Sequence, residues 1–158
     1  MINYFIDEIT LKFEGYRNVD GFLPSEAGIY CIYRAELCDK KSVNLFELLY
    51  IGEAEDIKRR FSHHEHRDDW DKRLYLGEFL VYSFTPIDEE YNRKRAEAAM
   101  IYAHKRKYHR LINTSGTDSF NYGCLTIRTE GSNGLLYKQF TIYEYGNGQA
   151  SVRNIIDS

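Results

Sequence analysis

The chain alternates between stretches rich in β-branched and aromatic residues and stretches that are polar or repeat apolar residues every three to four positions. The first kind predicts three strands, at residues 28–36, 46–51 and 78–84. The second kind predicts two helices, over residues 53–66 and from about residue 89 to about residue 109. Two further alternating stretches, joined by a turn at the sequence SNG, predict a C-terminal β-hairpin over residues 124–145. The order ββαβα followed by a hairpin indicates an α+β fold.

The length of 158 residues is typical of one domain, and no linker or internal repeat interrupts the chain. We therefore expect a single domain over residues 1–158. The N-terminal sequence mixes acids with apolar residues, unlike a secretory signal, and no apolar run approaches the ~18 residues of a spanning helix. A soluble, cytoplasmic protein without a membrane partner is expected. Three cysteines without a C-x-x-C pair, Cys31, Cys38 and Cys124, favour reduced thiols.

The net charge of −3 does not by itself indicate a nucleic-acid-binding protein, but the charge is unevenly distributed. Residues 93–110 contain seven lysines and arginines and a single acid, Glu97. Such a run is often a solvated helix face, and the alternative is a local surface that binds phosphates. The candidate phosphate-binding residues are Lys58, Arg59, Lys105, Arg106 and Lys107.

Three candidate site residues lie on the predicted helices: Arg60, His64 and Glu97. Arg60 and His64 are four residues apart and should project from the same side of the first helix. Glu97 shares a face of the second helix with an apolar residue, so its carboxylate should be only partly exposed. Simple ion pairs are the alternative for both, Arg60 with Asp56 and Glu97 with Arg93, each four residues away.

Six features, in this order, resemble the GIY-YIG endonuclease superfamily. They are GIY at residues 28–30, YIG at residues 50–52, an arginine ten residues after Tyr50, a histidine four residues later, Glu97, and Asn113 just after the second helix. Each motif is weak alone, whereas six in the right order are hard to obtain by chance. The resemblance covers residues 28–113 and implies a small three-stranded antiparallel sheet flanked by helices, to which the hairpin is appended. It also implies hydrolysis of phosphodiester bonds in DNA with one divalent metal ion, Mg²⁺ or Mn²⁺.

The resemblance implies a role for each motif residue. Glu97 anchors the metal ion, and Arg60 holds a phosphate oxygen. Tyr30 or His64 activates the attacking water. Tyr50 binds phosphate or supports the site, although strand packing is the plain alternative for both tyrosines. The structural residues near the site are Gly28, Gly52 and Asn113.

Two classes of function remain open at this point. One is a metal-dependent DNA endonuclease, and the other is a catalytically silent or partner-dependent DNA-binding module with the same fold. Chemically competent residues at all six motif positions favour the enzyme. One cleavage centre most simply cuts one strand, so double-strand cleavage would require a dimer or a protein partner. The histidine-rich residues 63–66 could suggest zinc, but only His64 fits the nuclease pattern and no cysteine lies nearby.

Overall fold

The computed structural model describes residues 5–157; residues 1–4, part of the segment considered above as a possible signal, and Ser158 lie outside the described residues. The described elements, in chain order, are β1 (Asp7–Asn18), β2 (Gly28–Leu37), β3 (Val43–Ala54), α1 (Ile57–Ser62), α2 (Arg67–Asp71), β4 (Phe79–Pro86), α3 (Glu90–Lys107), β5 (Leu125–Gly131), β6 (Gln139–Gly146) and β7 (Gln149–Ile156). None of the helices in this part of the chain is long and apolar enough to cross a membrane.

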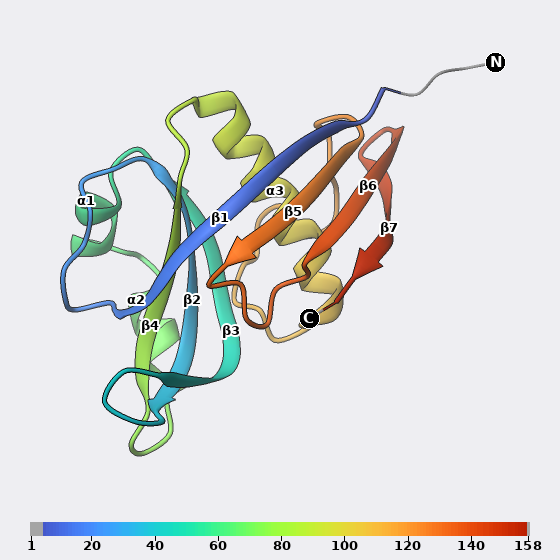
Figure 1. Ribbon diagram of the computed structural model, residues 1–158. Coiled ribbons are helices and arrows are strands. Elements are labelled where there is room, and N and C mark those ends of the chain that lie inside the picture. Colours follow the sequence, from blue (N-terminus) through green and yellow to red (C-terminus); the bar gives the residue numbers. More distant parts are fainter. Residues whose placement is uncertain (1–4, 158) are drawn as a thin grey trace.

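The strands form one mixed sheet of seven strands in the order β3-β2-β4-β1-β5-β6-β7. The predicted α+β fold, a small three-stranded antiparallel sheet flanked by helices with an appended hairpin, is therefore wrong, and the described chain is mostly β. The physical reason is β1, which pairs antiparallel with β4 and parallel with β5 and so joins the two groups of strands. Figure 1 shows β1 running between these two groups of strands. Through β1, the C-terminal strands continue the sheet.

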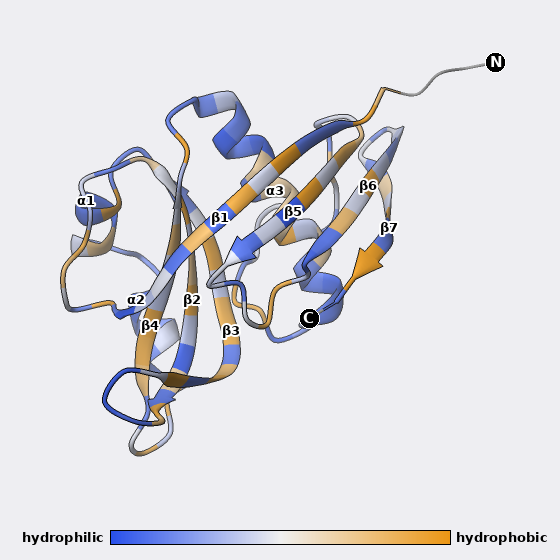
Figure 2. Cartoon of the chain, viewed as in Figure 1, coloured by the Kyte–Doolittle hydropathy of each residue, from blue (hydrophilic) through white to orange (hydrophobic). Residues whose placement is uncertain are grey.

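The strand β1 was not among the predicted strands, although its sequence alternates clearly. Ile9, Leu11 and Phe13 recur at every second position, and Leu11 and Phe13 are buried in the core. Figure 2 shows the matching alternation of hydrophobic and hydrophilic residues along this strand. The strands β5 and β6 confirm the predicted pairing of residues 124–145, although residues 132–138 connect them instead of a tight turn. The edge strand β7 was not predicted, because its second half, residues 153–156, is exposed and has no regular alternation of apolar and polar residues.

The two faces of the sheet carry separate hydrophobic cores. Alternate residues of β2 from Ile29 to Ala35 pack in a cluster that includes apolar residues of α3. Tyr30 and Ile32 point to the opposite face, where they pack with Ile57 of α1 and Trp70 of α2. This strand is therefore buried on both faces, which explains its nearly continuous apolar sequence. The motif tyrosine Tyr30 consequently belongs to the α1 and α2 face.

The first predicted helix, residues 53–66, is much shorter than expected. The strand β3 continues beyond Gly52 to Ala54, and Asp56 then caps α1 by accepting a hydrogen bond from the backbone N–H of Arg59. The helix ends at Ser62, so His64 lies beyond it and does not share a helical stripe with Arg60. The second predicted helix, by contrast, matches α3 within two residues at each end.

Candidate active site

Tyr30 and His64 are in direct contact although 34 positions separate them. Tyr30 Oη lies 2.7 Å from His64 Nε2, and both residues are buried. The backbone N–H of His66 donates to His64 Nδ1 over 3.1 Å, so the neutral ring carries its proton on Nε2. Burial, followed by the charges of Arg60 and His66, lowers the pKa of His64 to about 3. His64 is therefore neutral at pH 7 and donates to the Tyr30 oxygen.

Arg60 lies on α1 close to both motif tyrosines. Burial raises the pKa of Tyr30 and of Tyr50, and the charge of Arg60 counteracts that rise for each of them. The guanidinium Nη2 pairs with Glu65 Oε1 at 3.2 Å, and its side chain is 30% exposed. The alternative pair with Asp56 is not formed, because the Asp56 side chain caps α1. Arg60 can therefore present positive charge to a phosphate at the surface.

Tyr50 connects the buried part of the site to solvent. Its ring stacks on that of Tyr30, with centroids 6.2 Å apart, and tilts against that of His66, with centroids 5.1 Å apart. Trp70 supports it from α2 at 5.5 Å. Tyr30 is only 1% exposed, whereas Tyr50 is partly exposed and lines a pocket. Tyr50 is thus the motif tyrosine that a bound molecule in the pocket would contact first.

Glu97 projects from α3 as an acid without full charge compensation. Burial and then the nearby charge of Glu53 raise the pKa of Glu97 to about 7. The expected alternative partner of Glu97, Arg93, instead pairs with Glu53 at 2.6 Å and donates to the backbone carbonyls of Ile87 and Asp88. Because Arg93 is only 2% exposed, this arrangement is fixed within the fold, and Glu97 does not have Arg93 as its ion-pair partner. The Glu97 carboxylate instead accepts a hydrogen bond from the backbone N–H of Glu53.

The three predicted structural residues each have a definite packing role. A Cβ on Gly52 would overlap the ring end of Tyr30, and one on Gly28 would overlap Phe84 and the backbone of Thr85. These glycines therefore allow close packing inside the protein, rather than the close approach of substrate. The Asn113 side chain accepts from the Ile51 N–H at 3.0 Å and donates to the Ile51 carbonyl at 2.7 Å. It replaces a neighbouring strand at the outer edge of β3, between Tyr50 and Gly52.

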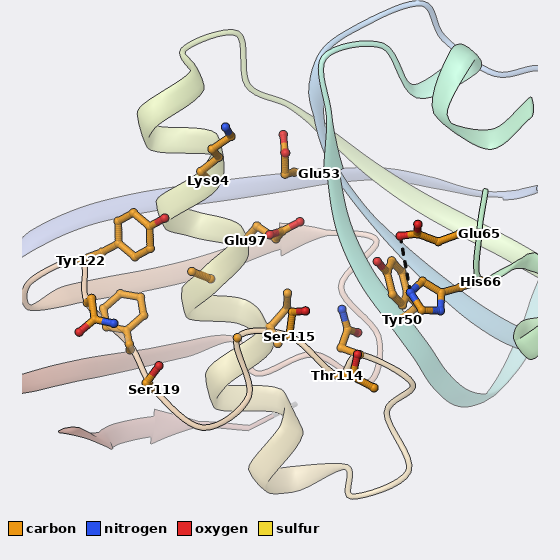
Figure 3. Close-up of a pocket in the computed structure, with 16 residues that line it drawn as sticks. Tyr50, Glu53, Glu65, His66, Lys94, Glu97, Thr114, Ser115, Ser119 and Tyr122 are labelled. Atoms are coloured by element: carbon orange, nitrogen blue, oxygen red, sulfur yellow. Dashed lines mark ion pairs between the residues drawn. The ribbon is translucent and has the colours of Figure 1, made fainter. Parts of the chain in front are cut away.

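A pocket of about 420 Å³ brings several of these groups together. Figure 3 shows Glu97 extending from α3 towards the side where Tyr50 and His66 lie, with Glu53 near Glu97 and Lys94. The opposite part of the wall is the segment after α3, which contributes Thr114, Ser115, Gly116, Ser119, Phe120, Asn121 and Tyr122. The pocket therefore has charged and imidazole groups at one end and hydroxyl, amide and aromatic groups at the other.

The basic residues predicted to contact phosphates lie in two places. At the end of α3, Lys105 donates to the backbone carbonyls of residues 109 and 111. Arg106 donates to the backbone carbonyls of residues 102 and 117. Lys107 pairs with Asp157. These three charges thus have partners within the protein. Lys58 and Arg59 are exposed on α1, directly before Arg60, and Arg59 lines an open groove together with Arg60.

The donor set fits a hard divalent ion that is shared with a bound phosphate. Among residues 5–157 no group of three or more histidine, cysteine or acidic side chains is arranged to hold a metal ion. Magnesium and manganese are commonly held by one or two carboxylates, with phosphate oxygens and water at the remaining positions. Glu97 supplies such a carboxylate in the pocket, and a cation there would offset its burial and its repulsion by Glu53.

Sequence reasoning missed three parts of this site. Glu53 follows Gly52 directly and was assigned to the first turn of a helix, whereas it belongs to β3 and meets Glu97. His66 matches no motif, because among the histidines of residues 63–66 only His64 fits the nuclease pattern. The pocket wall formed by residues 114–122 carries no motif. An acid immediately after YIG was the one signal that the sequence offered for Glu53.

Comparison with known proteins gives one partial match. Over 90 residues, 57% of the chain, the sequence is 28% identical to UvrABC system protein C of Fervidobacterium nodosum. The chain covers only 14% of the length of that protein, so the similarity concerns a small part of it. No family model and no solved structure matches the chain.

Proposed function

We propose that this protein is a metal-dependent DNA endonuclease of the GIY-YIG type. The observation that carries the proposal is the proximity of five motif residues that come from separate segments of the chain: Tyr30, Tyr50, Arg60, His64 and Glu97. The partial similarity to UvrABC system protein C supports a nuclease domain of this type with DNA as its substrate. Hydrolysis of a phosphodiester needs these groups, because water must be activated and phosphate charge neutralised.

Tyr30 is the better candidate for activating the water. His64 cannot serve easily as the base, because its Nδ1 accepts from the backbone, its Nε2 already carries a proton and its pKa is lowered to about 3. Burial is the largest influence on Tyr30 and raises its pKa, whereas the charge of Arg60 acts in the opposite direction. A base role for Tyr30 therefore requires further positive charge, such as a bound metal ion, in addition to Arg60 and the donating Nε2–H of His64. His64 then acts by holding and polarising the Tyr30 hydroxyl.

Arg60 and Tyr50 bind the scissile phosphate in this proposal. The guanidinium offers several N–H groups in one plane, which suits two phosphate oxygens at once. The Tyr50 hydroxyl donates to a third oxygen at the pocket entrance. Glu97 would hold Mg²⁺ or Mn²⁺, which would supply positive charge to offset the negative charge of the phosphate. Lys58 and Arg59 extend the positive surface along α1, where the DNA backbone continues.

One observation favours the second candidate, a DNA-binding module that does not cut by itself. Tyr30 is 1% exposed, and its burial raises its pKa. A hydroxyl in that position reaches an attacking water only if the site opens when DNA or a partner protein binds. The two candidates differ in what the isolated protein does to DNA.

Incubation of the purified protein with supercoiled plasmid tests the proposal, in parallel reactions with Mg²⁺, Mn²⁺ and EDTA. An endonuclease with one centre should yield mainly nicked circles with either metal ion and none in EDTA. DNA binding without nicking under all three conditions would establish the silent module instead. Neither binding nor nicking would overturn both candidates.

A further inference from the structure

His66 has the geometry of an oriented acid in the pocket, although no motif includes it. Its Nδ1 lies 3.2 Å from Asp69 Oδ2, one helical turn ahead on α2. This contact fixes the ring and leaves Nε2 directed towards the pocket side, where Glu65 Oε1 is 3.8 Å away. The side chain is 24% exposed, so it is accessible without being loosely held.

The position of His66 relative to Tyr50 suggests what this acid does. Tyr50 contacts Tyr30 through a stacked ring and contacts His66 through a tilted one. A phosphate bound at the Tyr50 hydroxyl would therefore have Tyr30 and His66 as neighbours from different elements. Displacement at phosphorus requires the attacking and leaving oxygens to lie roughly in line on opposite sides. With Tyr30 serving the attacking water, His66 is placed to serve the leaving oxygen.

The shape of the pocket agrees with this assignment. His66 and Glu97 line the same volume of about 420 Å³, which continues past them to the wall formed by residues 114–122. Ligand pockets of a few hundred Å³ hold molecules the size of a nucleoside. The nucleoside that carries the leaving oxygen can therefore occupy the pocket beside His66, while the rest of the DNA follows α1.

We propose that His66, oriented by Asp69, is the general acid that protonates the leaving 3′ oxygen, and this rests on the nuclease function proposed above. The water oxygen forms a bond to phosphorus and gives a proton to Tyr30. The bond between phosphorus and the 3′ oxygen breaks, and its electron pair stays on that oxygen. The Nε2–H of His66 supplies the proton, so that the products are a 5′-phosphate and a 3′-hydroxyl. Tyr30 accepts the water proton as a phenolate, so the cycle closes when solvent takes that proton from Tyr30 and returns a proton to His66.

The charged and titratable groups around His66 come from several elements. Glu65 and Asp69 lie in its own segment, His64 and Tyr50 contact its ring, and Glu97 faces it across the pocket. The bond to His64 uses only the backbone N–H of residue 66. Substitution of the His66 side chain therefore leaves the orientation of His64 intact and tests the acid role separately.

A substrate with an improved leaving group provides the test. A DNA oligonucleotide is cleaved with Mn²⁺ at a position mapped with the wild type, once with a normal 3′ oxygen and once with a 3′ bridging sulfur. A thiolate leaves without a proton, so it does not need a general acid. His66→Ala should be slower than the wild type by about 100-fold or more on the oxygen substrate. On the sulfur substrate it should cleave within a few-fold of the wild-type rate.

Matched variants separate this role from a structural one. Tyr30→Phe should be slow on both substrates, because attack still needs activated water, and His63→Ala should resemble the wild type on both. His66→Gln, which keeps the size of the side chain, should repeat the His66→Ala result if the alanine variant is unstable. Equal slowing of the His66 variants on both substrates, or no slowing on the oxygen substrate, would overturn the acid role. Failure of the wild type to cleave either substrate would instead overturn the nuclease function.

Discussion

Glu97→Gln should stabilise the protein at neutral and alkaline pH in the absence of divalent metal. The raised pKa of Glu97, about 7 instead of 4.5, means that the native state holds a proton that the unfolded state has released. Stability therefore falls as pH rises between these two values and stays reduced above the higher one. At about 1.36 kcal/mol per pH unit, the cost of keeping Glu97 ionised reaches about 3 kcal/mol. Glutamine has nearly the same shape but does not bear this cost.

Urea unfolding of both proteins in EDTA, followed across the range from about pH 4.5 to about pH 8, measures the difference directly. The two free energies of unfolding should be similar at the acid end and diverge as pH rises, with the variant the more stable. Saturating Mg²⁺ should stabilise the wild type more than the variant. A difference in the free energy of unfolding that does not change with pH would show that burial does not raise the pKa of Glu97. A variant that is less stable than the wild type at every pH would show the same.

Three further predictions follow from the contacts of the site. Tyr30→Phe should reduce plasmid nicking by about 100-fold or more, while the loss of its bond to His64 lowers the free energy of unfolding by only about 1 kcal/mol; undiminished nicking would remove Tyr30 from the chemistry. The double change Lys58→Gln with Arg59→Gln should weaken the salt dependence of DNA binding, measured by fluorescence anisotropy. The slope of log K for DNA binding against log salt concentration should become flatter by about 2, because each lost phosphate contact removes about 0.9. The triple change of Lys105, Arg106 and Lys107 to Gln serves as the comparison. It should flatten the slope less than the double change, since these charges have partners in the protein. A larger effect of the triple change would place the DNA along α3. Asn113→Ala should lower the free energy of unfolding by about 2–4 kcal/mol in urea titrations, because it leaves the N–H and carbonyl of Ile51 without their side-chain partners. A loss below about 0.5 kcal/mol would show that water replaces the Asn113 amide.

The elements that carry the motifs could be predicted because their signals are local. The alternation in β2, the apolar run of β3 before Gly52 and the long α3 are all visible within a few residues. The sheet as a whole could not be predicted in this way. It depends on the parallel pairing of β1 with β5, residues 7–13 with residues 125–131, and no local pattern specifies such a distant contact.

The same distinction applies to the candidate site. Spacing of four residues placed Arg60 and His64 together, and they do meet at Tyr30, but for a different reason. His64 comes after the end of α1 and is held by the backbone of residue 66, rather than by a helical stripe. The pairing of Arg93 with Glu53 was likewise invisible in the sequence, where Glu97 was the nearer acid. The partner of a charged side chain depends on all the groups that surround it in the folded protein. Spacing along a helix determines only the neighbours on that same helix.

The central claim is that Glu97 serves cleavage rather than DNA binding, and the nicking rate of Glu97→Ala at matched DNA occupancy tests it most directly. Anisotropy without metal sets the protein concentrations at which the wild type and the variant bind equal fractions of supercoiled plasmid, and Mg²⁺ is then added to both. Removal of an acid beside a polyanion should leave binding at least as strong as in the wild type. Nicked circles are expected with the wild type, and none above background with the variant. Nicking by the variant at the wild-type rate, with or without EDTA, would contradict it.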